Sequence, residues 1–252
     1  RDDLVTGVQT CALPISMSNF VLIAVPLFIY MGIMLEKSGL AESLLETMAM
    51  LFGRFRGGLA IAVVIVGAML AASTGIVGAT VVTMGLISLP TMLKRGYSKS
   101  LATGTIASAG TLGQIIPPSV VLVLLGSVLN VSVGNLFQAA VLPGILLVVL
   151  YLIYIVVVST FSPEKAPMMP AEELEQFYRE GMWKRVIQAF LLPLLLILAV
   201  LGSIFAGIAS PTEAAGVGAL GATILTLISG KFSLKVLKEV MRETTFLTSM
   251  VF

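Results

Sequence analysis

The sequence predicts an all-α polytopic membrane protein with a re-entrant helical hairpin, a broken helix and inverted repeats. Of its 252 residues, 58% are hydrophobic and only 11% are charged, whereas about 25% of the residues in a soluble domain are charged. Residues 57–93 carry no charge but are interrupted by Ser73, Thr74 and Gly75. Residues 100–163 are also uncharged and contain a double proline. These observations indicate several membrane helices, two of them discontinuous.

Composition excludes several classes of function. The chain has no histidine, and Cys11 is its only cysteine. Catalysis by a Ser-His or Cys-His pair, a His-ligated zinc site and an internal disulfide are therefore excluded. No Walker-type phosphate loop occurs. The net charge of +2 does not indicate nucleic-acid binding, and the basic residues are better explained as topology signals.

The domain organisation follows from shifts in composition. Residues 1–16 resemble a translated sequencing adapter, and we expect a non-native segment there; a native polar head is the alternative. Residues 17–160 are the expected first repeat and residues 161–185 an aqueous cytoplasmic linker. Residues 186–252 are expected to be the truncated start of a second repeat, so that the chain is a fragment at both ends.

Residues 20–35 are the first predicted span, and residues 40–52 differ from it in character. Six apolar side chains in the latter segment recur at helical spacing, with Glu42 and Glu46 on another face. This pattern predicts an amphipathic arm helix along the cytoplasmic interface that leads into the hairpin. An ordinary cytoplasmic connector is the alternative.

Residues 57–93 are predicted to form the re-entrant hairpin. A full crossing needs about 20 apolar residues, so the stretch is too long for one span and too short for two spans and a turn. Basic residues flank both ends: Arg54, Arg56, Lys94, Arg95 and Lys99. The positive-inside rule places both ends on the cytoplasmic side. The first arm would end near Ala72 with free carbonyls, and the second would begin near Ile76 with free amides.

Residues 98–129 are predicted to form a helix broken near its middle. Pro117 and Pro118 have no amide hydrogen, so the carbonyls of Gly113 and Gln114 lose their helical partners. A simple proline kink is the alternative. Residues 101–113 are mostly small, which lets another backbone approach closely, and the hairpin is the expected neighbour.

The remaining spans complete the predicted topology. We expect a connection at residues 130–137 and spans at residues 138–160, 186–205 and 214–229. Before the last of these, Ser210 to Glu213 reads as either a capping box or part of an ion or proton relay, and we favour the cap.

The end of the chain suggests that the second repeat is inverted. A basic amphipathic strip is expected at residues 231–243, and a new apolar run begins at residue 245. With alternating spans, every Lys and Arg after Arg1 falls on the cytoplasmic side. The last run would then be inverted relative to the first span, as in the repeats of secondary transporters.

Two stretches carry a resemblance to a known family. Residues 67–119 and residues 207–220 resemble the large membrane subunit of tripartite ATP-independent periplasmic (TRAP) transporters, and the resemblance extends over residues 17–252. It implies an elevator-type secondary transporter, not an enzyme, in the bacterial inner membrane. Such a protein uses a sodium gradient to import small organic acids such as C4-dicarboxylates, sialic acid or keto acids. The implied partners are an extracytoplasmic substrate-binding protein and a small four-helix membrane subunit.

The resemblance also implies a sodium ion between the hairpin tip and the broken-helix loop. The residues expected to hold it are Ser73, Thr74, Gly75, Gly113, Gln114, Ile116 and Pro117. Those expected near the substrate are Gly78, Thr80, Pro118 and Ser119. A hydroxyl and several freed carbonyls would form an all-oxygen shell of the kind that a hard cation accepts. Members of the family continue with a second hairpin and a second double-proline loop, which this sequence does not contain.

Three other functions compete with this interpretation. An intramembrane hydrolase based on Ser73 or Ser210 would need a lysine base, and no lysine is expected at membrane depth. A channel or structural subunit would also tolerate re-entrant loops, but inverted repeats favour alternating access. Another ion-coupled anion symporter with inverted repeats remains the nearest alternative.

Overall fold

The computed structural model describes residues 20–37, 39–74, 77–170 and 186–251, and within these ranges the only regular structure is helical. The first half contains η1 (Phe20–Ile23), α2 (Ala24–Lys37), α3 (Leu40–Phe52), α4 (Gly58–Thr74), α5 (Val77–Lys94), α6 (Lys99–Thr111), η2 (Leu112–Gln114) and α7 (Val120–Leu129). The second half contains α8 (Val133–Phe161), η3 (Pro163–Lys165), η4 (Ile187–Leu191), α11 (Leu192–Phe205), α12 (Pro211–Ile228) and α13 (Leu234–Val251).

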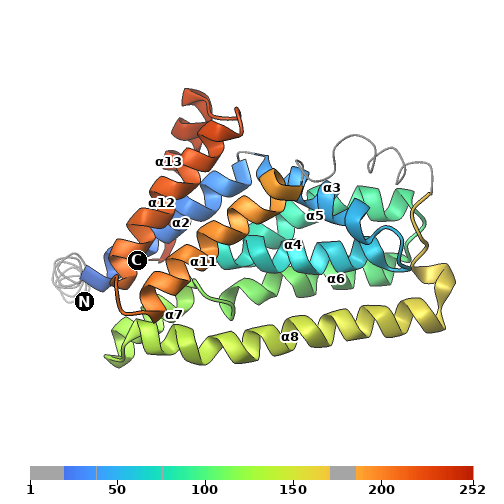
Figure 1. The fold of residues 1–252 in the computed structure, drawn as a ribbon, viewed down its shortest axis with the longest axis horizontal. Coiled ribbons are helices and arrows are strands. Elements are labelled where there is room, and N and C mark those ends of the chain that lie inside the picture. Colours follow the sequence, from blue (N-terminus) through green and yellow to red (C-terminus); the bar gives the residue numbers. More distant parts are fainter. Residues whose placement is uncertain (1–19, 38, 75–76, 171–185, 252) are drawn as a thin grey trace, which may run out of the picture.

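The helices pack around two hydrophobic clusters. We call the first the hairpin cluster; α3, α4, α5 and α6 build most of it, together with Ile155 near the end of α8. We call the second the α2 cluster; α2, α7, α11, α12 and α13 build it, together with Val133 and Phe137 at the start of α8. Figure 1 shows α8 running along the length of the molecule past both groups of helices. α8 therefore joins the two clusters.

α2 is the centre of its cluster because small residues let α12 approach it closely. A Cβ atom on Gly218 of α12 would come within 2.7 Å of the Met31 sulfur atom. The hydroxyls of Tyr30 and Thr223 lie 3.0 Å apart and form a hydrogen bond between the same two helices. Glycine at this contact allows the close helix packing that membrane proteins favour.

The start of α8 corrects one expected boundary. We placed a connection at residues 130–137 and a span at residues 138–160, whereas α8 begins at Val133 and ends at Phe161. Val133 and Phe137 lie one helical turn apart and are both buried in the α2 cluster, and the Phe137 ring packs edge-on against Phe28. This burial extends the helix through Gly134 and Asn135, although both residues have low helix propensity.

α3 has the bounds that its periodicity predicts. It starts after Gly39, whose φ of +68° is favoured by glycine, and its axis makes an angle of 62° with that of residues 21–37. Leu44, Leu45 and Met48 are buried, whereas Glu42 and Glu46 are exposed. The helix is therefore amphipathic, with its apolar face on the hairpin cluster.

The start of α12 confirms the capping box. The Ser210 side chain accepts a hydrogen bond from the Glu213 N–H at 3.3 Å, and the Glu213 carboxylate accepts one from the Ser210 N–H at 2.7 Å. Pro211 occupies the first helical position. The two side chains thus provide hydrogen-bond partners for backbone N–H groups that the start of the helix would otherwise leave unpaired. α13 is continuous from Leu234 to Val251, so the basic strip and the final apolar run share one helix.

By length and composition, two of the described helices can cross a membrane, namely Val133–Phe161 and Pro211–Ile228. The bent pair formed by residues 21–37 and 40–52 would be a third span. The remaining apolar helices are shorter, including Gly58–Leu70 and Thr80–Lys94 in the hairpin and Val120–Leu129 after the break.

Candidate functional site

Residues 57–93 form two helices, α4 and α5, whose outer ends meet. Tyr97, three residues after the end of α5, is buried, and its hydroxyl forms hydrogen bonds with the backbone of Leu59 and Ala60 in the first turn of α4. Burial raises the pKa of this phenol. The stretch therefore folds back on itself rather than forming one straight rod.

A segment from elsewhere in the chain holds both outer ends of the hairpin. The Gly57 N–H donates to the Ala166 carbonyl at 3.3 Å, and the Ser98 N–H donates to the Lys165 carbonyl at 3.1 Å. The Met169 N–H donates to the Gly53 carbonyl at 3.2 Å. We call residues 165–169 the clip. Exposed basic residues surround these contacts: Arg54, Arg56, Lys94, Lys99 and Lys165.

α6 packs against both arms of the hairpin, and small residues form these contacts. A Cβ atom on Gly67 of α4 would come within 2.6 Å of the Ala109 Cβ in α6. A Cβ atom on Gly110, the next residue of α6, would come within 2.3 Å of the Val81 side chain in α5. The small residues of α6 thus have the neighbour that the sequence predicted, because only side chains of this size permit so short a distance between helices.

The helix that contains α6 is interrupted where the sequence predicted. α6 ends at Thr111, η2 covers Leu112 to Gln114, and α7 starts only at Val120. The Pro117–Pro118 peptide bond in between is cis. Both proline nitrogens lack a hydrogen, so the carbonyls of Gly113 and Gln114 have no donor four residues further on.

Ser119 completes the break. Its hydroxyl donates to the Gln114 carbonyl at 2.8 Å and accepts from the Leu122 N–H at 3.4 Å, which caps α7. The side chain is fully buried. One of the two carbonyls freed by the prolines thus has a hydroxyl partner. On the far side of the loop, a Cβ atom on Gly144 of α8 would come within 3.0 Å of the Ile116 side chain.

The two interruptions lie at the same end of α6. The last turn of α6 packs against Gly67 and Val81, and both α4 and α5 contact η2. The end of α4 at Thr74 and the start of α5 at Val77 are therefore close to Gly113. This arrangement places the carbonyl end of α4, the amide end of α5 and the interrupted backbone of residues 112–119 in one region.

The expected site residues fall into three groups. Gly113, Pro117 and Pro118 are buried in the break, Ile116 is half-buried, and Gln114 is exposed. On α5, Gly78 is exposed and Thr80 is buried. Ser73 and Thr74 form the end of α4, where the structure describes the backbone only, and Gly75 lies outside the described residues.

The donor set of this region suits a hard monovalent cation. Its polar atoms are backbone carbonyls and hydroxyls, and within the described residues no group of three or more His, Cys, Asp or Glu side chains could hold a metal ion. Uncharged oxygens match sodium better than a divalent or thiophilic metal. The Gly113 carbonyl fits this role best, because its helical partner is removed and Ser119 bonds to Gln114 instead.

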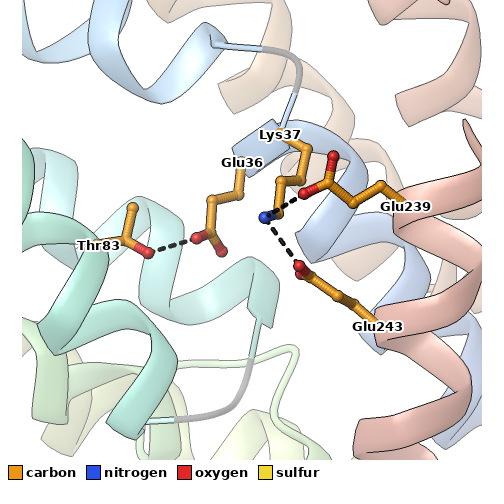
Figure 2. A network of polar contacts seen from close by, with 5 residues as sticks. All are labelled: Glu36, Lys37, Thr83, Glu239 and Glu243. Atoms are coloured by element: carbon orange, nitrogen blue, oxygen red, sulfur yellow. Dashed lines mark hydrogen bonds and ion pairs between the residues drawn. The ribbon is translucent and has the colours of Figure 1, made fainter. Parts of the chain in front are cut away.

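Sequence reasoning missed a polar cluster at the end of α2, shown in Figure 2. Thr83 of α5 donates a hydrogen bond to the Glu36 carboxylate. Lys37 forms ion pairs with Glu239 at 3.1 Å and Glu243 at 2.8 Å, both on α13. The only sequence signal was that Glu36 and Lys37 follow an apolar span. Their partners lie too far along the chain for a local pattern to reveal them.

The sequence matches a known protein family along almost the whole chain. The profile of the family described as "Tripartite ATP-independent periplasmic transporter, DctM component" matches residues 3–252. The C4-dicarboxylate TRAP transporter large permease protein DctM of Vibrio cholerae is 39% identical over 203 residues, which are 80% of this chain and 43% of that protein.

Two further relatives carry names with other substrates. The ectoine/5-hydroxyectoine TRAP transporter large permease protein UehC of Ruegeria pomeroyi is 32% identical over 234 residues, 92% of this chain and 52% of that protein. The sialic acid TRAP transporter large permease protein SiaM of Vibrio cholerae is 32% identical over 234 residues, 92% of this chain and 53% of that protein. The chain spans about half the length of the curated relatives that it matches.

Proposed function

The chain belongs to the DctM family of tripartite ATP-independent periplasmic transporters, and on this premise we propose that it is part of a multi-pass large permease subunit that imports small organic acids across the bacterial inner membrane. C4-dicarboxylates, sialic acid and ectoine appear in the names of three relatives. The substrate class proposed for this chain is therefore a small organic acid or zwitterion.

The observation that supports transport is the meeting of two interrupted elements. Backbone that is not helical is tolerated at membrane depth only where protein buries it or where it lines a wet cavity, because an unpaired peptide group costs several kcal/mol in hydrocarbon. The ends of α4 and α5 and the loop after η2 lie together, and interrupted helices of this kind form the binding sites of secondary transporters. In this proposal the hairpin is re-entrant, with its basic outer ends on the cytoplasmic side.

We propose that sodium is the coupling ion and that it supplies the positive charge that draws the transported anion inward. The residues that would hold it are Gly113, Gln114, Ile116 and Pro117 on the broken helix, and Ser73, Thr74 and Gly75 on the hairpin. The substrate would lie beside them, near Gly78, Thr80, Pro118 and Ser119. The start of α5 directs its free amides toward this region, which favours an anionic group.

The partners proposed are a small four-helix membrane subunit and an extracytoplasmic substrate-binding protein. The small subunit would cover apolar helix faces, and α8 offers exposed apolar side chains along most of its length, including Leu142, Leu146 and Ile153. The transport movement proposed is of the elevator type, in which the hairpin cluster moves relative to the α2 cluster.

The test is uptake by the full-length permease reconstituted in liposomes with its two partners. We expect accumulation of a C4-dicarboxylate, sialic acid or ectoine only when sodium is higher outside, and loss of accumulation when the gradient is collapsed. Ser73→Ala should raise the sodium concentration needed for half-maximal uptake. Uptake that ignores the sodium gradient but follows a proton gradient would assign the chain to another class of ion-coupled symporter. Single-channel currents would instead indicate a channel.

A further inference from the structure

The polar cluster of Figure 2 joins two groups of helices that have separate cores. Glu36 lies in the last turn of α2, the helix at the centre of the α2 cluster. Thr83 lies on α5, whose residues Met84 and Met92 are buried in the hairpin cluster. The hydrogen bond between their side chains therefore crosses from one cluster to the other.

Glu36 is held in position by its neighbour in the chain. Lys37 is fixed to α13 by Glu239 and Glu243, at 3.1 Å and 2.8 Å, and α13 packs against α2 within the same cluster. With Lys37 bound on that side, Figure 2 shows the Glu36 side chain directed away from α13, toward the hairpin. The end of α2 thus has one charge anchored to its own cluster and one presented to the other.

A second polar contact near this boundary lies where the two clusters are covalently connected. Lys231 donates to the Gly39 carbonyl at 3.0 Å and to the Ser43 hydroxyl at 3.2 Å, at the start of α3. Because α2 and α3 are consecutive in the chain, this contact can persist while the hairpin moves. Glu36 and Thr83 are 47 residues apart in sequence, so their hydrogen bond has no such covalent constraint.

We propose that Glu36 is a positioning residue that holds the hairpin through Thr83 in one of the two transport states and releases it in the other. The inference rests on the proposed transport function, which requires the hairpin to move relative to α2. A hydrogen bond to a carboxylate is stronger than one between neutral groups, so the Glu36–Thr83 bond biases the equilibrium between the two states. Apolar contacts between α2 and α4 make up much of the remaining boundary and have no directional preference to oppose sliding.

A cross-linking experiment in the full-length permease with its partners tests the proposal. Glu36→Cys with Thr83→Cys would be joined by a short, reducible bifunctional thiol reagent in a background without other cysteines. Tyr30→Cys with Thr223→Cys is the matched control, because those side chains are also hydrogen-bonded, at 3.0 Å, but lie within the α2 cluster. We expect both pairs to be linked, and we expect only the first link to stop uptake, which should return on reduction.

The yield of the links gives a readout that does not depend on uptake. Addition of sodium should change the linking rate of the Glu36–Thr83 pair severalfold and leave that of the Tyr30–Thr223 pair unchanged. A Glu36–Thr83 pair that links equally fast in both conditions, that never links, or that transports normally once linked would overturn the proposal. If the unlinked wild-type permease shows no sodium-driven uptake, the transport proposal fails, whereas the linking rates still decide whether the contact is state-dependent.

Point variants of Thr83 test whether its hydrogen bond to Glu36 affects transport or only supports the fold. Thr83→Val keeps the shape of the side chain but removes the hydroxyl, and it should shift the sodium concentration for half-maximal uptake roughly tenfold, the effect of losing one hydrogen bond to a charged group. Thr83→Ser keeps the hydroxyl and should stay close to the wild-type value. Equal sodium dependence of the two variants would contradict the assignment. If Thr83→Val fails to fold, the linking rates of the cysteine pairs decide whether the Glu36–Thr83 contact differs between the two transport states.

Discussion

Ala109 of α6 lies so close to Gly67 of α4 that a Cβ atom on residue 67 would come within 2.6 Å of the Ala109 Cβ. On the neighbouring residue of α6, a Cβ atom on Gly110 would come within 2.3 Å of Val81. Two successive positions of one helix therefore contact the two arms of the hairpin. This contact places the interruption between α4 and α5 beside the interruption that follows α6.

Gly67→Ala should destabilise the hairpin. The added methyl group has no space beside Ala109, so α4 and α6 must separate, at a cost of about 1–3 kcal/mol. We expect a lower midpoint of thermal unfolding in detergent and reduced sodium-driven uptake. Gly104→Ala is the control, because nothing lies within 4 Å of a Cβ atom at that position of α6. Wild-type behaviour of Gly67→Ala would show that the two helices are not in close contact.

Pro117→Ala should weaken the response to sodium without unfolding the protein. Alanine supplies an N–H four residues after Gly113, so the Gly113 carbonyl can form a helical hydrogen bond instead of facing an ion. We expect the sodium concentration for half-maximal uptake to rise roughly tenfold, equivalent to ~1.4 kcal/mol.

Pro143→Ala is the matched control for that experiment. Pro143 also lies in an apolar helix, but α8 continues through it without a break. Its replacement should leave the sodium dependence unchanged. An equal effect of both replacements would mean that the break at residues 112–119 has no special relation to the ion.

Ser119→Ala should lower stability through two lost contacts. The hydroxyl caps α7 at the Leu122 N–H and donates to the Gln114 carbonyl, and loss of an N-cap alone costs about 0.5–2 kcal/mol. Thermal unfolding should show the loss, and Ser119→Thr, which keeps the oxygen, should recover most of it. Unchanged stability together with lost substrate uptake would instead assign the hydroxyl to the substrate.

Glu213→Gln should be nearly neutral for both stability and transport. Glutamine at the third helical position still accepts the Ser210 N–H, so the capping box is kept without the charge. Ser210→Ala, by contrast, should lower the free energy of unfolding by about 0.5–2 kcal/mol. Sodium-driven or proton-driven uptake lost in Glu213→Gln, with the unfolding temperature intact, would revive the role of Glu213 as an ion or proton relay.

The parts of the structure that local sequence dictates were predictable. The apolar periodicity of residues 40–52 gave both ends of α3, Ser210 and Glu213 marked the start of α12, and the missing N–H groups of Pro117 and Pro118 located the break. Each of these signals acts within about five residues. The start of α8 was mistaken because burial of Val133 and Phe137 against α2 outweighed the low helix propensity of Gly134 and Asn135.

The parts that depend on distant partners were not predictable. Lys37 bonds to Glu239 across 202 residues, and the sequence contains no repeat or motif that pairs them. The association of the small residues of α6 with the hairpin was predicted from their size, but the particular contacts of Ala109 and Gly110 were not. The side chains of Ser73 and Thr74 are not described, so their place in the ion site stays a prediction.

The clip constrains the movement proposed for the hairpin. Lys165 and Ala166 accept hydrogen bonds from Ser98 and Gly57, and Met169 donates one to Gly53. These bonds oppose separation of the two arms at their outer ends. In the proposed elevator movement, both arms, the clip and the adjoining end of α8 would move together. The bending would then fall at the links between the two clusters, which include the connection from α2 to α3 and the break at residues 112–119 as well as α8.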